Sequence, residues 1–314
     1  RPFRPSAVPE DPLMRLEDRL RDFFTGRGFL EAVTLPFAPA TDGVVELLHP
    51  LSAEESRLRR ALASGLVRRI EYNFARGVYD VRLFELGTAF APGVAPDAPP
   101  AESRRVAAVL TGVRTPGHWT GESGAFDVWD LKALLVDIAA ELGLDASSVE
   151  PGAAPDAAAV LDAAEAFRVT DDDGRALGGG GRVRRDAVES PARAEAVWAL
   201  ELTLAPAMAE RAPVTYRPLP TQPAIERDLA LLVPEDVAAA RVESVIRESA
   251  GEHLEHVAPF DLYRGRGVPA GTRSIAYRLR FRAPDRTLED READEVVRRT
   301  LNRLRDELGI ERRD

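Results

Sequence analysis

The sequence contains no cysteine, which excludes a disulfide framework and zinc sites built on cysteine. This fits the reducing cytosol, so a cytoplasmic protein is expected. No apolar run approaches the roughly 20 residues that a membrane-spanning helix needs, and the N-terminus lacks the pattern of a signal peptide. A membrane partner is therefore not expected. The chain begins with Arg1 and not with Met, so we expect that an upstream segment has been removed.

Lysine is almost absent, because Lys132 is the only one among the 42 basic residues. Two explanations of the abundant arginine stay open. It can reflect genomic base composition, which favours Ala, Arg and Pro together, or it can serve RNA, since arginine suits phosphates and stacked bases. The formal net charge of −10 argues against a protein that coats nucleic acid non-specifically. It leaves a local RNA-binding patch possible.

Length and proline distribution predict more than one domain. A chain of 314 residues is long enough for two or three domains, and a hydrophobic content of 45% suffices for globular cores. Five prolines lie between Pro206 and Pro223, which is a linker composition. We therefore predict a domain over residues 1–212 and a second one over 213–314.

The first 212 residues mix helical and strand periods. Asp11 and Pro12 suit the start of a helix, and Ser52 to Glu55 form a capping box for a second helix. Between Glu150 and Pro213 only one confident strand is found. The expected elements are a helix over 11–26, a strand over 28–37, a helix over 52–77, strands over 79–90 and 104–112, a helix over 127–142 and a strand over 197–204.

After residue 213 the patterns follow the order strand, helix, strand, strand, helix, strand. The expected elements cover 227–233, 238–250, 256–263, 272–281, 288–308 and 310–313. This βαββαβ order is that of a ferredoxin-like fold, in which the helices cover one face of the sheet and the other face stays open. The fold class is therefore α+β.

Residues 274–282 alternate clearly between apolar and polar side chains, as a half-buried strand does. The apolar residues should pack under the helices: Ile275, Tyr277, Leu279 and Phe281. The other set should line the open face: Ser274, Ala276, Arg278, Arg280 and Arg282.

Three arginines two residues apart repel one another unless negative charge lies nearby. One hypothesis is a surface that contacts the RNA backbone; the other is a solvated face relieved by acidic neighbours. The near-neutral total that we count for residues 217–314, 18 arginines against 19 acidic residues, suits RNA recognised by shape. Arg227 has a structural alternative, an ion pair with Asp261 or Glu226. The candidate RNA-binding residues are Arg278, Arg280, Arg282, Arg264, Arg266 and Arg227.

Several motifs are spread over nearly the whole chain. Three of them lie in the predicted second domain: Arg227–Val233, Phe260–Gly265 and Thr287–Leu288. The others lie in the predicted first domain: Pro50–Ser52, Arg59–Leu66, Asn73–Phe90, Trp119 and Asp130–Lys132. The first set resembles the ferredoxin-fold anticodon-binding domain, and the second the catalytic-like domain, of the bacterial phenylalanyl-tRNA synthetase beta subunit family. The resemblance implies a class II synthetase-like antiparallel sheet with flanking helices, followed by the ferredoxin-like domain.

The resemblance also implies a function and partners. In that family two alpha and two beta subunits esterify phenylalanine to tRNA(Phe) with ATP and magnesium, and the alpha subunit performs the chemistry. The alpha subunit, tRNA(Phe) and a second alpha–beta pair are thus the expected partners. No catalytic residue and no cofactor are expected on this chain. Residues 28–37 resemble the first class II motif, which serves subunit contact, and imply four interface residues: Phe29, Val33, Pro36 and Phe37.

Other motifs that could carry chemistry are weak. Gly178–Arg182 lacks the Lys-Ser/Thr of a phosphate loop, so a surface turn is expected. It also lacks the His-Pro that ends a glycine-spaced strand in the family, which leaves the fold of about 150–191 open. His253 and His256 have a metal-ligand spacing but no clustered partner, so no metal is expected. Asp171–Gly174 begins like a calcium loop but lacks the later ligands.

Two other functions stay open. One is a stand-alone RNA-binding or regulatory protein that reuses the class II scaffold without serving a synthetase. The other is a self-sufficient ligase with its own active site, which the missing catalytic motifs disfavour. Degenerate second-motif residues at Arg82–Phe90 and the absence of a third motif both point to a silent site. The editing and oligonucleotide-fold domains of the family would lie upstream of Arg1.

Overall fold

The structure is a computed structural model that describes residues 10–95, 98–121, 123–144, 149–152, 160–170, 174–188, 196–210, 216 and 219–313. The chain divides into two compact units, Arg1–Pro213 and Val214–Asp314, and each is treated by itself. The boundary predicted between 212 and 213 lies outside the described residues and stays a prediction. Within the described residues no helix is both long and apolar enough to cross a membrane.

The first unit is built on a mixed seven-stranded sheet. Strand β1 runs parallel to its neighbour β5, whereas the other neighbouring pairs are antiparallel. In sheet order the strands are β1 (Leu30–Glu31), β5 (Val81–Ala91), β6 (Ala101–Thr111), β10 (Trp198–Thr203), β9 (Ala176–Val183), β8 (Leu161–Thr170) and β7 (Val149–Pro151).

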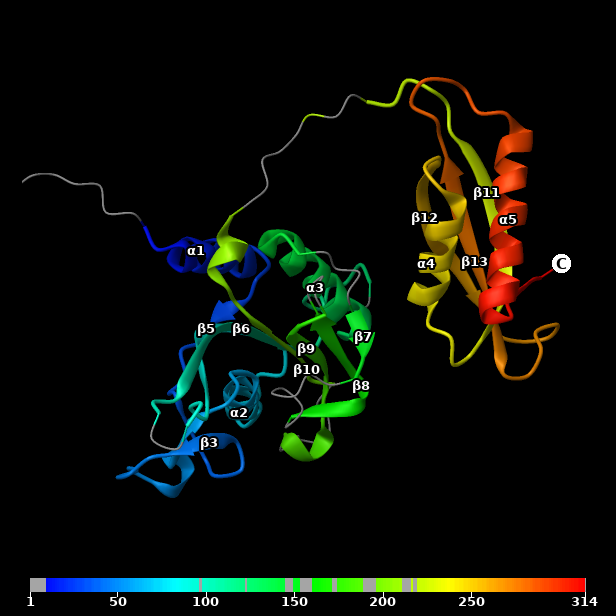
Figure 1. Cartoon of the computed structure of the whole chain (residues 1–314). Helices are drawn as coiled ribbons and strands as arrows, with labels where there is room; N and C mark the ends of the chain where they lie inside the picture. The colour runs from blue at the N-terminus through cyan, green and yellow to red at the C-terminus, as the bar shows by residue number, and fades with distance from the viewer. Residues whose placement is uncertain are drawn as a thin grey trace, which may run out of the picture. The chain divides into compact units, whose positions relative to one another are not determined.

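Helices cover both faces of this sheet, as Figure 1 shows. The helices α1 (Pro12–Thr25) and α3 (Val128–Leu142) pack on one face, and α2 (Ala63–Phe74) packs on the other. Strand β6 supplies both cores, because Val106 faces α1 and α3 while Ala107 faces α2. Successive strand residues point to opposite faces, so a sheet covered on both sides is continuously apolar.

The predicted helix over 52–77 begins in the wrong place. Residues Ala53–Glu55 form a 3-10 turn, Arg57–Arg59 form strand β4, and α2 starts only at Ala63. Ser52 makes no capping hydrogen bond. The start of α2 is instead capped by the Glu201 carboxylate of β10, which accepts from the N–H groups of Leu62 and Ala63 at 2.9 Å each. A cap that comes from 138 residues away leaves no local sequence signal.

Most of the strand predicted over 28–37 does not form. Only Leu30–Glu31 pairs with β5 as a strand. The Ala32 N–H still bonds to the Phe84 carbonyl at 2.7 Å, and the next strand is β2 (Phe37–Ala38). The strands β2, β4 and β3 (Gly43–Glu46) make a separate three-stranded sheet in the order β2-β4-β3. The Thr34 N–H, which a strand neighbour would need, is taken by the side chain of Glu85 at 3.2 Å.

The glycine run is a strand and not a surface turn. Gly178–Gly181 lie inside β9, between β8 and β10. Gly178 has φ +155°, and a Cβ placed on it would lie 2.0 Å from the carbonyl oxygen of Glu201. Glycine is required here because the backbones approach too closely for a side chain. The described parts of 150–191 thus complete the main sheet, while Asp171–Asp173 of the calcium-like motif lie outside the described residues.

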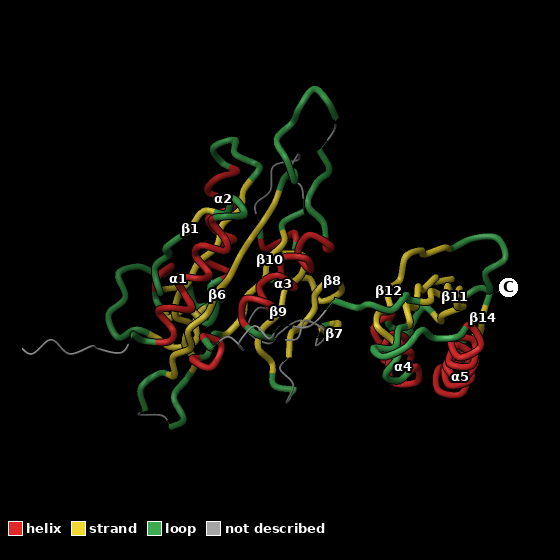
Figure 2. Tube along the Cα trace, turned by 90° about the horizontal axis from the view of Figure 1, so that it is seen from above, coloured by secondary structure: helices red, strands yellow, loops and turns green. Residues whose placement is uncertain are grey.

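The second unit has the predicted βαββαβ order. Its elements are β11 (Ile225–Pro234), α4 (Ala239–Ala250), β12 (Leu254–Tyr263), β13 (Thr272–Phe281), α5 (Asp290–Leu308) and β14 (Glu311–Arg312), with sheet order β12-β13-β11-β14. Figure 2 shows α4 and α5 on the same side of the sheet. The predicted inward residues of β13 are buried there. The α+β class and the ferredoxin fold are confirmed.

Candidate nucleic-acid interface

The open face of the four-stranded sheet carries arginines that are already paired. Both Nε and Nη2 of Arg278 donate to the Asp228 carboxylate of β11, at 2.9 Å each. Arg280 holds Glu226 in the same way, at 3.1 and 2.8 Å. The hydrogen bonds from Arg278 lower the pKa of Asp228. Arg278 and Arg280 thus each lie opposite a carboxylate of the neighbouring strand β11.

Arg282 follows the same pattern at the end of β13. Its Nε lies 3.1 Å from Oε1 of Glu255, and its Nη1 donates to the carbonyl oxygen of Gln222. The repulsion that favoured an RNA backbone across these arginines is therefore relieved within the protein. Of the two hypotheses, the acidic neighbours are present in the structure, and RNA contact at Arg278, Arg280 and Arg282 stays a prediction.

Arg227 lies on the other face of the sheet, against α5. It donates to Asp290 at 2.6 Å and to Asp294 at 2.8 Å. The alternative partners were wrong, since among the described residues Asp261 does not pair with it and Glu226 offers only its backbone carbonyl, at 3.0 Å. The geometry favours a structural clamp between β11 and α5.

The two loop arginines differ from each other. Arg264 makes a two-atom contact with Glu235, at 2.9 and 3.0 Å, and Arg273 donates to the same carboxylate at 3.0 Å. The side chain of Arg266 has no hydrogen-bond or ion-pair partner within the part of the chain that the structure describes. Of the six candidate arginines, Arg266 is the one whose charge is uncompensated.

The double contact to Glu235 predicts a measurable pH effect. Hydrogen bonds from Arg264 and then Arg273 lower the pKa of Glu235 from its usual 4.5 to about 2. A depressed carboxyl pKa stabilises the fold above the unfolded pKa, and this contribution is lost as the pH falls from 4.5 towards 2. We expect Glu235→Gln to lower the thermal midpoint of the second unit at pH 7 but not near pH 2. An NMR titration that finds a pKa near 4.5 for Glu235 would contradict this assignment.

Aromatic residues on the open face were missed as site residues. Phe260 is 52% exposed, and the guanidinium of Arg278 lies 4.9 Å from the centre of its ring. Tyr263 is also exposed, with Arg313 at 4.7 Å from its ring centre. The available signal was Pro259, because proline inside a strand marks an edge or a bulge.

The four residues expected at a subunit contact differ in their exposure to solvent. Phe29 is buried in the core of the first unit, with its ring 5.4 Å from that of Phe24, so its assignment to a surface was wrong. Val33 is 90% exposed, whereas Pro36 and Phe37 are half-buried. Phe29 turns inward because it follows directly on the tight turn that ends α1, where its N–H bonds to the Phe24 carbonyl at 3.1 Å.

Further exposed apolar side chains lie near this segment in the sequence, and no sequence pattern pointed to them. They are Leu30, Leu35, Leu48 and Leu51. A run of exposed large apolar side chains is typical of protein–protein contact surfaces. Among the described residues, none donates to or accepts from the backbone of Val33 or Leu35.

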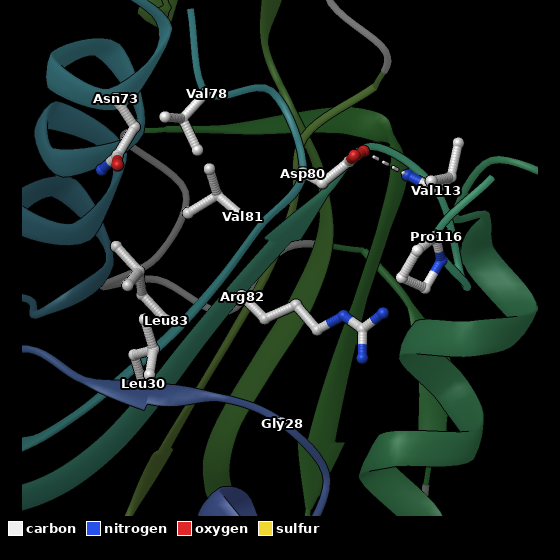
Figure 3. A pocket seen from close by; sticks show the side chains of 10 residues that line it. All are labelled: Gly28, Leu30, Asn73, Val78, Asp80, Val81, Arg82, Leu83, Val113 and Pro116. Carbon is white, nitrogen blue, oxygen red and sulfur yellow. Dashed lines mark hydrogen bonds between the residues drawn. The ribbon is translucent and has the colours of Figure 1, made fainter. Parts of the chain in front are cut away.

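A pocket of about 290 Å³ lies at the β1 edge of the main sheet. Figure 3 shows Arg82 and Asp80 among its lining side chains. Arg82 donates to the carbonyl oxygens of Arg27 and Arg114, at 3.4 and 2.5 Å, and Asp80 accepts from the Val113 N–H at 2.9 Å. These polar groups tie loops together, so Arg82 and Asp80 hold structure at this edge.

Within the described residues, no three His, Asp or Glu side chains lie close enough together to hold a metal ion. His256 lies opposite Arg280 in the β12–β13 ladder. The positive charge of Arg280 would repel a metal ion bound to His256.

The two units define the class of this protein: an α+β chain with a helix-covered mixed sheet, followed by a ferredoxin fold with one open face. Two family profiles match it. Residues 2–204 match the phenylalanyl tRNA synthetase beta chain CLM domain, and residues 220–313 match the ferredoxin-fold anticodon binding domain. The chain belongs to the phenylalanyl-tRNA synthetase beta chain family.

Several relatives, all named phenylalanine–tRNA ligase beta subunit, are similar to this protein over most of its chain. The phenylalanine–tRNA ligase beta subunit of Anaeromyxobacter dehalogenans is 36% identical over 312 residues, which cover 94% of this chain and 38% of that protein. That of Moorella thermoacetica is 37% identical, with 91% and 35% covered. That of Xanthomonas campestris is 38% identical, with 86% and 33% covered. The chain thus spans about a third of the length of these relatives.

Proposed function

We propose that this chain is the non-catalytic part of a phenylalanine–tRNA ligase beta subunit that supports subunit assembly and binds tRNA(Phe). The observation that carries the proposal is the succession of a beta-chain CLM unit and an anticodon-binding unit in one chain. The relatives at 36–37% identity are named as beta subunits of the same ligase. The lack of cysteine suits a cytoplasmic setting.

The chemistry belongs to the whole enzyme in this proposal. Phenylalanine is esterified to tRNA(Phe) with ATP and magnesium on the alpha subunit, and two alpha–beta pairs assemble. The chain itself needs no ATP or magnesium site. Its polar groups in the pocket beside Arg82 are engaged in backbone hydrogen bonds, which supports a structural role for that region.

The exposed segment Val33–Leu35 supports the assembly role. Two apolar side chains point outward there while Thr34 between them is bound to Glu85 at 2.7 Å. Burying such side chains against a partner removes apolar surface from water, at about 25 cal/mol per Å². We therefore assign the alpha subunit to this segment.

Co-purification tests the assembly role. Replacing Val33 with Glu should reduce the recovery of a co-expressed alpha subunit at least about tenfold, because a desolvated charge at the contact costs more than 1.4 kcal/mol. Val94 is fully exposed in another loop of the first unit, so Val94→Glu is the matched control and should retain the alpha subunit.

Two results distinguish the rival functions. If the unaltered chain retains no alpha subunit but binds tRNA, it is a stand-alone RNA-binding or regulatory protein. If it charges tRNA with phenylalanine without an alpha subunit, it is a self-sufficient ligase.

A further inference from the structure

One edge of the four-stranded sheet in the second unit is only partly covered. Strand β14 pairs with β11 at Leu231 and Leu232, and one further bond joins the Arg313 N–H to the Ala230 carbonyl at 2.8 Å. The remaining residues of β11, 225–229, pair with β13 on one side. On the other side no described strand covers them. We call residues 225–229 the β11 edge.

The backbone groups of the β11 edge are available for a further strand. Neighbouring residues of a strand direct their N–H and C=O groups to opposite edges. Because the Ala230 carbonyl faces β14, Asp228 and Glu226 direct their groups to the same side. The Glu226 carbonyl accepts from Arg227 Nη1 at 3.0 Å. Within the described residues, the Asp228 carbonyl and the N–H groups of Glu226 and Asp228 have no such bond.

The opposite edge of the sheet is protected against pairing, whereas the β11 edge is not. Strand β12 contains Pro259 and two irregularities in its pairing with β13. Proline and bulges keep an edge strand from pairing with another chain. Strand β11 pairs with β13 in unbroken register from Ile225 to Pro234, and its only proline is that last residue. Of the two edges, the β11 edge is the one that can accept a strand.

The charge along the β11 edge is negative on balance. Four carboxylates and three guanidinium groups lie beside it: Glu226, Asp228, Asp290, Asp294, Arg227, Arg278 and Arg280. Both bonds from Arg280 go to Oε1 of Glu226, so Oε2 has no partner in the described part of the chain. The carboxylates of Asp290 and Asp294 accept from Arg227 through Oδ1 alone. Their side chains are 81% and 57% exposed, so a cation can reach the other oxygens.

This pattern of charge disfavours two occupants. In an antiparallel pair of two β11 edges centred on Arg227, Glu226 of one copy would lie opposite Asp228 of the other copy. Like charges directly opposite each other destabilise a strand pair, so a second copy of the chain does not fit. An RNA backbone does not fit either, because its phosphates would approach carboxylate oxygens that have no cation.

A peptide strand with basic residues at alternate positions fits the same edge. Residues opposite each other in an antiparallel pair have their side chains on one face. The residues opposite Glu226 and Asp228 would therefore lie beside carboxylates, and the residue between them would lie opposite Arg227, where an apolar side chain avoids repulsion. A strand added to a sheet gains affinity from backbone hydrogen bonds and specificity from alternate side chains.

We propose that the β11 edge binds an extended segment of a protein partner that carries basic residues at alternate positions, and that this segment adds to the sheet as a strand. The inference goes beyond the proposed function, because it requires neither RNA binding nor the exposed segment at Val33.

Binding of a capped peptide of alternating arginine and valine to the whole chain, followed by NMR of the backbone amides, tests the proposal. In the free chain the N–H groups of Glu226 and Asp228 should exchange with deuterium faster than those of Arg227 and Leu229, which face β13. When nine-tenths of the chain is bound, exchange at Glu226 and Asp228 should slow about tenfold, because only the free tenth exchanges. A peptide of alternating glutamate and valine should not bind.

Three variants separate the backbone contribution from the charge. Glu226→Pro removes an N–H that faces the edge and leaves the bonds to β13 intact, so it should weaken peptide binding about tenfold or more. Glu226→Gln removes only the charge and should weaken binding about 1.5- to 5-fold, as loss of an exposed ion pair does. Glu255→Gln is the matched control, because Glu255 pairs with Arg282 on the protected edge, and it should leave peptide affinity unchanged.

Thermal unfolding checks that each variant is folded, and Glu226→Gln keeps the test valid if the proline variant is not. Slow exchange of Glu226 and Asp228 in the free chain would show that the β11 edge is already covered, which overturns the proposal. Failure of the arginine peptide to bind, equal binding of the glutamate peptide, or an equal effect of Glu255→Gln and Glu226→Gln overturns it as well. Protection of both amides that rises with chain concentration alone would identify a second copy as the occupant instead.

Discussion

Replacing Arg59 with methionine should lower the unfolding free energy of the first unit by about 3–5 kcal/mol, because it leaves a buried carboxylate without its cation. Arg59 and Glu85 are 5% and 2% exposed, and Arg59 Nη1 lies 2.7 Å from Glu85 Oε1. Arg59 also donates to the Thr88 carbonyl at 2.9 Å. A methionine fills similar volume but satisfies none of these acceptors.

Urea unfolding followed by circular dichroism measures this loss, and a double variant separates charge from volume. Arg59→Met with Glu85→Leu should recover most of the stability, since a buried ion pair replaced by apolar residues is often neutral. Arg280→Met, which breaks the exposed pair with Glu226, should cost less than about 1 kcal/mol. An Arg59→Met effect as small as that of Arg280→Met would show that water reaches the buried pair.

The same buried pair positions the proposed subunit contact. Glu85 accepts from the N–H of Thr34 at 3.2 Å and from its hydroxyl at 2.7 Å, and Arg59 donates to that hydroxyl at 2.8 Å. Side chains alternate along an extended segment, so anchoring Thr34 inward turns Val33 and Leu35 outward. Loss of the pair should therefore weaken co-purification of the alpha subunit as well as stability.

Elements with a strong local period could be predicted from the sequence. The helix α1 begins after Asp11 and ends at Gly26, as its caps predict, and the alternation in β13 assigned Tyr277 and Leu279 correctly to the core. These features depend on residues a few positions apart, so a single sequence contains the whole signal.

Features that depend on distant residues could not be predicted. The start of α2 is set by Glu201, and the charge of the open face is set by Asp228 and Glu226 on a strand about 50 residues earlier. Strand register decides which carboxylate lies opposite which arginine. The arginines were found, but their state of pairing was not.

In strand β9 the glycine run is visible in the sequence, but the close approach of the neighbouring strand that requires it is not. Gly178→Ala should lower the unfolding free energy of the first unit by about 3–5 kcal/mol, because alanine is strained at a glycine-only backbone angle and its Cβ overpacks the neighbouring strand. Gly178 pairs with Leu202 of β10, and the new Cβ would lie 2.0 Å from the Glu201 carbonyl oxygen. The carbonyl is backbone, so the strands themselves must separate.

That separation would displace Glu201, whose carboxylate holds Arg105 at 3.0 Å and caps α2. The substitution should thus disturb the packing on both faces of the sheet. Urea unfolding should show this as a lower unfolding free energy of the first unit, in a single cooperative transition. Gly117→Ala is the control: a Cβ there meets nothing within 4 Å, so its effect should stay within about 0.5 kcal/mol. Equal stability of the two variants would refute the close approach of β9 and β10. The glycine run would then be interpreted as a surface turn, as the sequence predicted.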